Sequence, residues 1–260
     1  MFTDSHCHLD RLNFTDDCPN LNAAMNQANE RGVTQFLCVS VRAENFSDLR
    51  HIAEQYSGVV LSVGDHPLEQ SLSSELSKEE LVALAEDPKV VAIGETGLDY
   101  HYCKGDLSWQ QERFRTHIQA AVAANKPLIV HTREAREDTI NILKEEGAER
   151  VGGVLHCFTE SLEMAEAAME LNFSISFSGI ITFKNASELR TVVQAIPMEK
   201  LLIETDSPYL SPVPNRGKPC FPAYVIEVAE KVAELKGLSV SEVAAITTEN
   251  YRRLFLRNFG

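Results

Sequence analysis

Basic residues are scarce in this chain. Of its 260 residues, 24 are Lys or Arg and 38 are Asp or Glu, which gives a formal net charge of −14. Domains that hold nucleic acid by bulk charge are usually basic, so this balance argues against that class of binding protein. It leaves room for an enzyme whose positive charge is confined to one site.

Long apolar runs and paired cysteines are also missing. No stretch approaches the roughly 20 apolar residues of a membrane-spanning helix, and no basic start with an apolar core marks a signal peptide. The six cysteines form no Cys-X-X-Cys pair, and a chain of this length buries a full core without disulfides. We therefore expect reduced thiols in a cytoplasmic protein that makes no membrane contact.

A two-part unit recurs along the chain: a short run rich in β-branched residues, then an amphipathic stretch. The runs cover residues 2–8, 34–40, 59–66, 89–95, 127–132, 151–157, 173–179 and 200–206. The stretches cover about 17–31, 43–56, 75–86, 108–125, 135–147, 161–171, 185–196 and 222–236, with a last one over 241–256. Alternating strands and helices predict a parallel sheet.

Eight such units in about 250 residues are the count of a (β/α)₈ TIM barrel, an α/β fold. The alternative is a doubly wound open sheet, which usually begins with a glycine-rich turn after its first strand. The chain has neither a GxGxxG nor a GxxxxGK[ST] motif. We therefore predict one barrel domain over residues 1–260, and Ser108 with Gln111 predicts a capping box at the start of one helix.

Chemically active side chains fall at the predicted strand ends, where TIM barrels carry their catalytic residues. Five of the eight histidines lie there, together with carboxylates: His6, His8, His66, Glu95, His131, His156, Glu204 and Asp206. Taken singly, His131 or His156 is as consistent with a hydrogen-bonded core histidine. The joint pattern favours a metal site.

Six of these residues offer more ligands than one ion needs, because a catalytic ion takes three or four and keeps one position open. The set therefore predicts two divalent cations about 3.5–4 Å apart. We assign His6, His8 and Asp206 to one ion and His131 and His156 to the other, with Glu95 as a bridge. Imidazole favours zinc or other late transition ions, and magnesium prefers oxygen. We expect zinc or manganese to bind more tightly than magnesium, and the working ion stays open.

The remaining residues receive roles around the ions. Asp206 is positioned to take a proton from a metal-held water, and Glu95 holds both cations, so these two carboxylates are the predicted catalytic groups. His66 is a candidate substrate contact. Glu204 is expected to orient a neighbouring group or to touch substrate, and Arg133 is suited to grip phosphate or to form a solvated salt bridge.

Several segments resemble one known family. Residues 4–10 (DSHCHLD), 94–100 (GETGLDY), 131–135 (HTREA), 156–158 (HCF) and 204–208 (ETDSP) resemble the TatD family of metal-dependent deoxyribonucleases in order and spacing. Residues 153–159 and 174–179 resemble its YcfH branch. The resemblance implies an amidohydrolase-like TIM barrel with two divalent metals on the same six residues. It also implies phosphodiester hydrolysis, often as a 3′→5′ exonuclease on DNA, and places His66 and Glu204 at the substrate.

One residue departs from the family pattern. Asp65 stands where the family usually has an apolar residue, and a carboxylate facing the site would repel phosphate. Adjacent strand residues point to opposite faces, so we expect Asp65 to point away from the face of His66.

The expected reaction is attack of metal-held hydroxide on a phosphodiester. Two dications, two carboxylates and one hydroxide sum to 4 − 2 − 1, or about +1, inside an acidic protein. We therefore expect weak, salt-sensitive capture and a preference for single-stranded DNA ends as substrate. No oligomeric state is predicted.

Two rival functions stay open. The same ligands can serve hydrolysis of carboxylic esters or amides, including the ester of a misacylated tRNA, because a barrel defines chemistry better than substrate. A non-catalytic protein that keeps a metal site is the other. Release of mononucleotides, release of an acid, or no turnover separates the three.

Overall fold

The eight predicted strands form one parallel sheet that curls into a barrel. The computed structural model describes residues 1–70 and 74–257. The spatial order of the strands follows the chain, and every hydrogen-bonded pair is parallel. The strands are β1 (Phe2–Cys7), β2 (Val33–Cys38), β3 (Val59–Val63), β4 (Val90–Asp99), β5 (Leu128–Arg133), β6 (Gly153–Leu155), β7 (Phe173–Phe177) and β8 (Leu201–Ile203).

The first and last strands meet and bring the sheet nearly to closure. Cys7 and Ser207 form a parallel bridge just beyond β8. The amide of His8 donates to the Ser207 carbonyl at 2.8 Å, and the amide of Asp206 donates to the His6 carbonyl at 2.9 Å. The predicted (β/α)₈ architecture is therefore confirmed.

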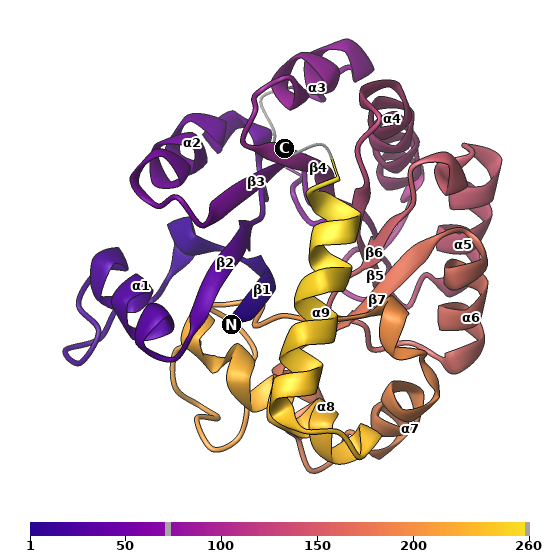
Figure 1. Ribbon diagram of the computed structural model, residues 1–260. Helices are drawn as coiled ribbons and strands as arrows, with labels where there is room; N and C mark the ends of the chain where they lie inside the picture. The colour runs from indigo at the N-terminus through magenta and orange to yellow at the C-terminus, as the bar shows by residue number, and fades with distance from the viewer. Residues whose placement is uncertain (71–73, 258–260) are drawn as a thin grey trace.

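Helices form the outer layer of the barrel (Figure 1). In the described ranges they are α1 (Leu21–Glu30), α2 (Phe46–Gln55), α3 (Lys78–Ala85), α4 (Ser108–Ala124), α5 (Arg136–Glu145), α6 (Leu162–Glu170), α7 (Ser187–Ala195), α8 (Val225–Lys236) and α9 (Val240–Phe255). The last helix lies across the amino-terminal end of the barrel instead of joining the outer ring. Among the described residues, no helix has both the length and the apolar character needed to cross a membrane.

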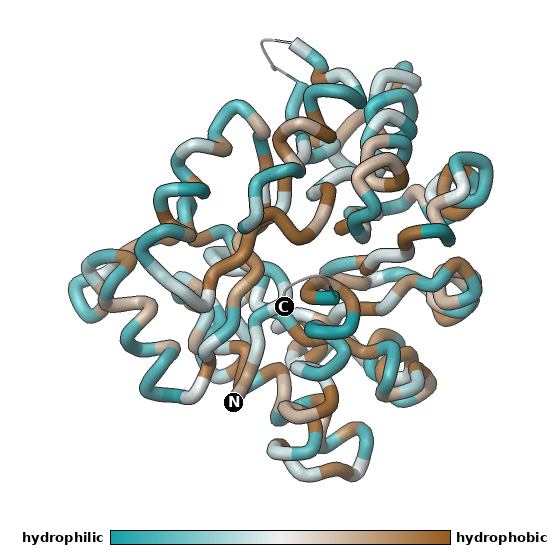
Figure 2. Tube along the Cα trace, turned by 45° about the horizontal axis from the view of Figure 1, so that its top comes forward, coloured by the Kyte–Doolittle hydropathy of each residue, from teal (hydrophilic) through white to brown (hydrophobic). Residues whose placement is uncertain are grey.

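Strand parity divides the apolar side chains between two cores. Leu128 and Val130 of β5 belong to the large core between sheet and helices. Ile129, between them, belongs to a smaller core inside the barrel, which Tyr251 and Phe255 of α9 complete. This alternation follows from the two-residue repeat of a strand. Figure 2 shows apolar residues concentrated along the strands and polar residues on the outer turns.

Several strands end earlier than predicted. The prediction extended them to His66, Cys157 and Asp206, but β3, β6 and β8 end at Val63, Leu155 and Ile203. The backbone turns directly after these strands, and Cys157 and Asp206 adopt positive φ of 43° and 54°. A strand cannot continue through that conformation, so these site residues lie on the loops that follow.

The predicted capping box is wrong. Ser108 is the first residue of α4, and the cap position belongs to Leu107, which makes no side-chain cap hydrogen bond. The carboxylate of Asp106 accepts from the amide of Ser108 instead, at 3.0 Å. The amide of Gln111, which the serine side chain was expected to cap, donates to the Leu107 carbonyl at 3.3 Å instead.

Candidate metal centre

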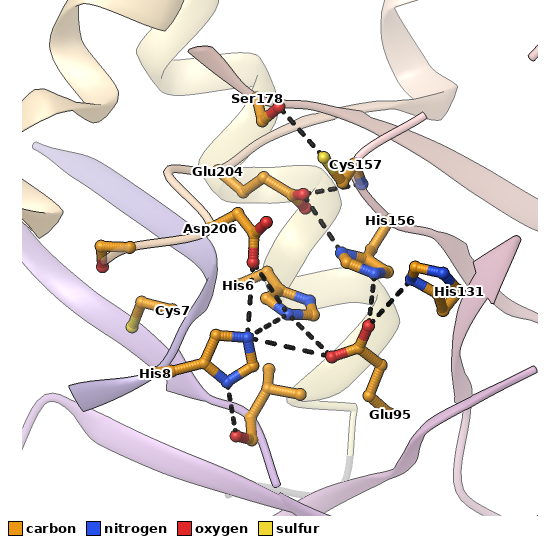
Figure 3. Close-up of polar contacts among 12 residues, drawn as sticks. His6, Cys7, His8, Glu95, His131, His156, Cys157, Ser178, Glu204 and Asp206 are labelled. Carbon is orange, nitrogen blue, oxygen red and sulfur yellow. Dashed lines mark hydrogen bonds and ion pairs between the residues drawn. The ribbon is translucent and has the colours of Figure 1, made fainter. Parts of the chain in front are cut away.

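The carboxyl ends of the strands bring the predicted ligands to one place. His131 lies on β5, His156 directly follows β6, and Glu204 and Asp206 follow β8. All of them therefore lie at the same end of the barrel. His6 and His8 arrive from β1 and the loop behind it, and Figure 3 shows these side chains converging. The structure thus brings all six predicted ligands together.

Glu95 lies at the centre of this cluster, and its two oxygens face different imidazoles. Oε2 is 3.4 Å from His6 Nε2 and 3.9 Å from His8 Nε2. Oε1 is 2.6 Å from His156 Nε2 and 3.4 Å from His131 Nδ1. This division matches the predicted bridge between two groups of ligands (Figure 3).

Glycines on either side of Glu95 let β4 approach β5 closely. A Cβ on Gly94 would lie 2.5 Å from the Ile129 carbonyl oxygen, and a Cβ on Gly97 would lie 2.0 Å from the His131 carbonyl oxygen. Both glycines also have φ above 130°. The Gly-Glu-Thr-Gly segment therefore holds Glu95 against the strand that carries His131, because only glycine fits at the two flanking positions.

Asp206 completes the group on the β1 side. Its Oδ1 lies 3.3 Å from His8 Nε2 and 3.7 Å from His6 Nε2. The side chain keeps 13% exposure, whereas those of His6 and His8 are buried. Asp206 is therefore the carboxylate of this group that solvent reaches.

Three imidazoles are held from outside the cluster. His8 Nδ1 lies 3.0 Å from the Val39 carbonyl, and His131 Nε2 lies 3.0 Å from Asp99 Oδ2. His156 Nδ1 lies 3.4 Å from Glu204 Oε1. In the neutral ring, the nitrogen held by the outer carbonyl or carboxylate keeps the proton, so the inward nitrogen can offer its lone pair to a cation.

These lone pairs fit a metal centre. The Nε2 atoms of His6 and His8 are 3.2 Å apart, close to the roughly 3.4 Å expected for two nitrogens bound tetrahedrally to one zinc ion. His156 Nε2 is buried and makes no aligned hydrogen bond within the described residues. Two sets of three residues, His6 with His8 and Glu95, and His6 with His156 and Asp206, meet the distances for one cation. A divalent cation requires buried nitrogen donors that face carboxylates and are not already engaged in hydrogen bonds, and this cluster provides such donors.

The pKa values show how strongly the cluster is coupled. Burial alone would raise the pKa of Glu95, but the charges of His156 and His66 hold that pKa well below its usual range. Burial alone would lower the pKa of His156, yet Glu95 and Glu204 bring it well above the ordinary value. At His6, burial and the neighbouring charge of His156 lower the pKa. Without cations, protons on some imidazoles balance the carboxylates, and a metal ion displaces them.

His66 differs from the other imidazoles at the site. The amide of Leu68 donates to His66 Nδ1 at 3.0 Å, so the proton of the neutral ring is on Nε2. That nitrogen is 3.2 Å from Glu95 Oε1. His66, Glu95 and His131 also meet the distances for a cation, but a protonated Nε2 donates a hydrogen bond and cannot ligate. The predicted role of His66 as a substrate contact agrees with this tautomer.

Glu204 is buried beside His156 rather than on the cavity wall. Its Oε1 accepts from the amide of Cys157 at 2.7 Å and faces His156 Nδ1. Of the two roles open to Glu204, this placement favours orienting His156. Its Oε2 is buried without a hydrogen-bond partner in the described structure.

A cavity of about 630 Å³ opens above the cluster. Arg133 lies on its wall, with its guanidinium over the ring of Tyr102 and no ion pair to any described carboxylate. Asp65 is absent from the wall: its carboxylate accepts from the Ala43 amide at 2.8 Å, so it points away from the site as expected.

Two functional carboxylates were missed from the sequence. Asp99 holds His131, and its position four residues after Glu95 on the same strand face was the available signal. Asp4 accepts from the amide and the hydroxyl of Thr205 at 2.9 and 2.5 Å. No local pattern identified Asp4, because Thr205 is 201 residues away along the chain.

Comparisons with known proteins agree with this geometry. Residues 3–256 match the family model for TatD related DNase. The chain is 48% identical over 252 residues to the Escherichia coli K12 protein YcfH, which bears the name of an uncharacterized metal-dependent hydrolase, covering 97% of this chain and 94% of that one. It is 43% identical to YabD of Bacillus subtilis, a protein with the same description, over 99% of this chain and all of that one.

Solved structures give the same result. The crystal structure of YjjV, a TatD homologue from Escherichia coli K12, superposes with a TM-score of 0.89 at 32% identity over 98% of both chains. A TatD family hydrolase from Entamoeba histolytica gives 0.84 at 25% identity, over 98% of this chain and 97% of that one. Family model, relatives and fold agree over nearly the whole length, so this chain belongs to the TatD family of metal-dependent hydrolases.

Proposed function

We propose that this hydrolase is a deoxyribonuclease that removes nucleotides from single-stranded DNA ends, in the 3′→5′ direction, with two divalent cations at the cluster. The observation that carries the proposal is Glu95, whose two oxygens face separate imidazole groups. A carboxylate in that position would be shared by two cations, and a cation pair would stabilise the charge on the attacking and leaving oxygens of a phosphodiester.

The residues fit two cation positions. His6, His8 and Asp206 would hold one ion, and His131 and His156 the other, with Glu95 shared. Bound cations supply positive charge to the phosphate oxygens and lower the pKa of a coordinated water. The imidazole-rich set favours zinc or manganese over magnesium.

The chain's own side chains divide the remaining work. Asp206, partly exposed in the cavity, is placed to accept the proton of the attacking water. His66, with its proton on Nε2, can donate to a phosphate oxygen. Asp99 and Glu204 fix the rings of His131 and His156.

The charge at the site is lower than the sequence suggested. Asp99 and Glu204 join Glu95 and Asp206, so two dications, four carboxylates and one hydroxide sum to 4 − 4 − 1, or about −1. The two arginines of the cavity wall then decide whether an anion binds. Arg133 forms no ion pair with the described residues, and Arg11 has a buried Nε without a hydrogen-bond partner, with Asp10 3.6 Å away. The Arg133 guanidinium is therefore available for a bidentate phosphate contact, whereas Arg11 already pairs with Asp10.

The test is digestion of end-labelled single-stranded DNA with magnesium, manganese or zinc supplied in turn, by wild type and by His131→Ala. We expect mononucleotides from wild type and none from the variant or from chelated protein. Activity that survives both the substitution and chelation contradicts the proposal. Release of acid from carboxylic esters without any cleavage of DNA points to acyl hydrolysis instead.

A further inference from the structure

Two exposed tyrosines stand on opposite walls of the cavity. Tyr102 and Tyr209 are 63% and 49% exposed, among the few large apolar side chains left open to solvent, and both line the cavity. Tyr102 follows β4 and Tyr209 follows β8. In a closed barrel of eight strands in chain order these two strands are diametrically opposite, so the metal centre lies between the two rings.

Tyr102 is fixed relative to the His131 side of the centre. Its amide donates to Asp99 Oδ1 at 2.8 Å, and Oδ2 of the same carboxylate holds His131. The guanidinium carbon of Arg133 is 4.7 Å from its ring centroid, and the ring of His101 meets it edge-on at 4.8 Å. The ring is therefore held in place while most of it stays open to solvent.

Tyr209 is fixed in the same way to the opposite side. Its amide donates to the backbone carbonyl of Asp206 at 2.9 Å. Its ring meets the ring of His8 edge-to-face with 6.1 Å between centroids. Each tyrosine is thus connected to a different predicted cation position, without belonging to the ligand set.

We infer that Tyr102 and Tyr209 form the stacking walls of two nucleoside subsites, one for each nucleoside that flanks the cleaved phosphodiester. The inference rests on the proposed function and names the part of the substrate that it left open. Because the two rings are already held in place, binding a base against them costs little side-chain conformational entropy. Any base can stack on an aromatic ring, but its face must not be covered by neighbouring bases. The two tyrosines therefore select single-stranded ends.

The experiment measures binding of three phosphate monoesters to the metal-loaded full-length protein by isothermal titration calorimetry. The probes are deoxyadenosine 5′-monophosphate, deoxyadenosine 3′-monophosphate and 2-deoxyribose 5-phosphate, which lacks the base. We expect both nucleotides to bind wild type roughly tenfold more tightly than the sugar phosphate. Tyr102→Ala should remove this advantage for one nucleotide and Tyr209→Ala for the other, and the pairing reveals which nucleoside each wall holds.

Matched variants guard against a general loss of structure. Tyr102→Phe and Tyr209→Phe keep the ring and should keep the advantage. Phe14→Ala also removes an exposed aromatic side chain, 46% open, but one outside the cavity, and should change nothing. The inference is overturned if nucleotides bind no better than the sugar phosphate, if neither alanine variant loses the advantage, or if both lose it for the same nucleotide.

A parallel assay keeps the two proposals separate. Wild type is incubated with the dinucleotide TpT and the same metals. Absence of cleavage contradicts the nuclease proposal, whereas base-dependent binding that disappears with each tyrosine still supports the subsites. Cleavage of TpT together with binding that does not depend on the base supports the nuclease proposal and contradicts the two nucleoside subsites.

Discussion

The two ends of the barrel differ in both chemistry and backbone. At the amino-terminal end, Tyr251 and Phe255 of α9 pack on Leu37 and Ile129 in an apolar core. At the carboxyl end, buried imidazoles and carboxylates face one another, and the loops hold four non-glycine residues at positive φ, Glu134, Cys157, Asp206 and Leu210. The two at the amino-terminal end, Asn125 and Asn172, are asparagines, which adopt this conformation readily. The comparison separates stability from chemistry: one end can be optimised for packing while the other tolerates strain and unpaired polar atoms.

The largest expected effect is a loss of activity at the carboxyl end of the barrel, where the candidate metal centre lies. Glu95→Gln should lower kcat/KM for phosphodiester cleavage by roughly a thousandfold or more, because one oxygen of the shared carboxylate becomes an amide nitrogen that cannot ligate. Elemental analysis should show fewer bound metal ions than in wild type. The free energy of unfolding of the chelated protein, measured with urea, should fall by up to about 3–5 kcal/mol, because the buried imidazoles lose the carboxylate that balances their charge.

Glu69→Gln is the matched control. Glu69 also lines the cavity but pairs with Arg42, away from the imidazoles. Its substitution should leave metal content unchanged. Full metal content in Glu95→Gln would refute the shared-ligand geometry.

The next largest effect is a loss of stability at the amino-terminal end of the barrel, where α9 packs. Tyr251 is one of the largest fully buried side chains, and Tyr251→Ala should lower the free energy of unfolding by about 3–5 kcal/mol through lost contacts and a cavity. Tyr251→Phe keeps the ring and should lose much less. Measured on the folded fraction, kcat/KM of both variants should match wild type, and a catalytic loss greater than the loss of folded protein would show that the two ends are coupled.

Asp4 helps to close the barrel, because it joins β1 to the segment after β8 that carries Asp206. Asp4→Ala leaves the amide and hydroxyl of Thr205 without their acceptor and should lower the free energy of unfolding by about 2 kcal/mol. Asp4→Asn keeps the shape and should be milder. Unlike Tyr251→Ala, Asp4→Ala should also reduce kcat/KM, and unchanged turnover would argue against a positioning role.

The same residue predicts a pH dependence. Burial raises the pKa of Asp4 to about 8 from an ordinary value of 3.8, so the folded state binds its proton more tightly than the unfolded state does. Its contribution to stability is therefore present below about pH 4 and is lost as pH rises toward 8. Urea unfolding of chelated wild type should weaken over that window relative to Asp4→Asn, and parallel curves would contradict the shift.

Metal affinity should depend on pH in the opposite direction. Burial alone would lower the pKa values of His156 and His131, but Glu95 and Asp99 raise them above the ordinary value. A cation must displace those protons, so affinity should fall as pH drops, by up to about tenfold per unit for each proton released. Competition with a chromophoric chelator measures it, and a flat profile from pH 6 to 8 would exclude proton displacement.

The smallest effect concerns the cavity wall. Arg133→Gln should raise KM for single-stranded DNA by about three- to tenfold and flatten the rise of KM with sodium chloride, because one phosphate contact is lost. Arg133→Lys should restore part of the salt response and less of the affinity. An unchanged salt slope in Arg133→Gln would place phosphate capture elsewhere.

The sequence was sufficient where a pattern is local. Strand-end position predicted the approach of His131, His156 and Asp206, because it is set by the strand that carries or precedes each residue. Strand ends were misjudged where the backbone turns at positive φ, which the side-chain pattern does not report. Asp99 and Asp4 were missed because the first holds a ring 32 residues away and the second holds Thr205 across the closure of the barrel.

That closure has a consequence for the chain as the ribosome makes it. The imidazoles of β1 are synthesised among the first residues, while Asp206 and the Thr205 contact to Asp4 emerge some 201 residues later. Contacts so distant in sequence form late in folding. The centre therefore has no complete ligand set until translation has passed β8, and a nascent or prematurely terminated chain has no means of hydrolysing what surrounds it.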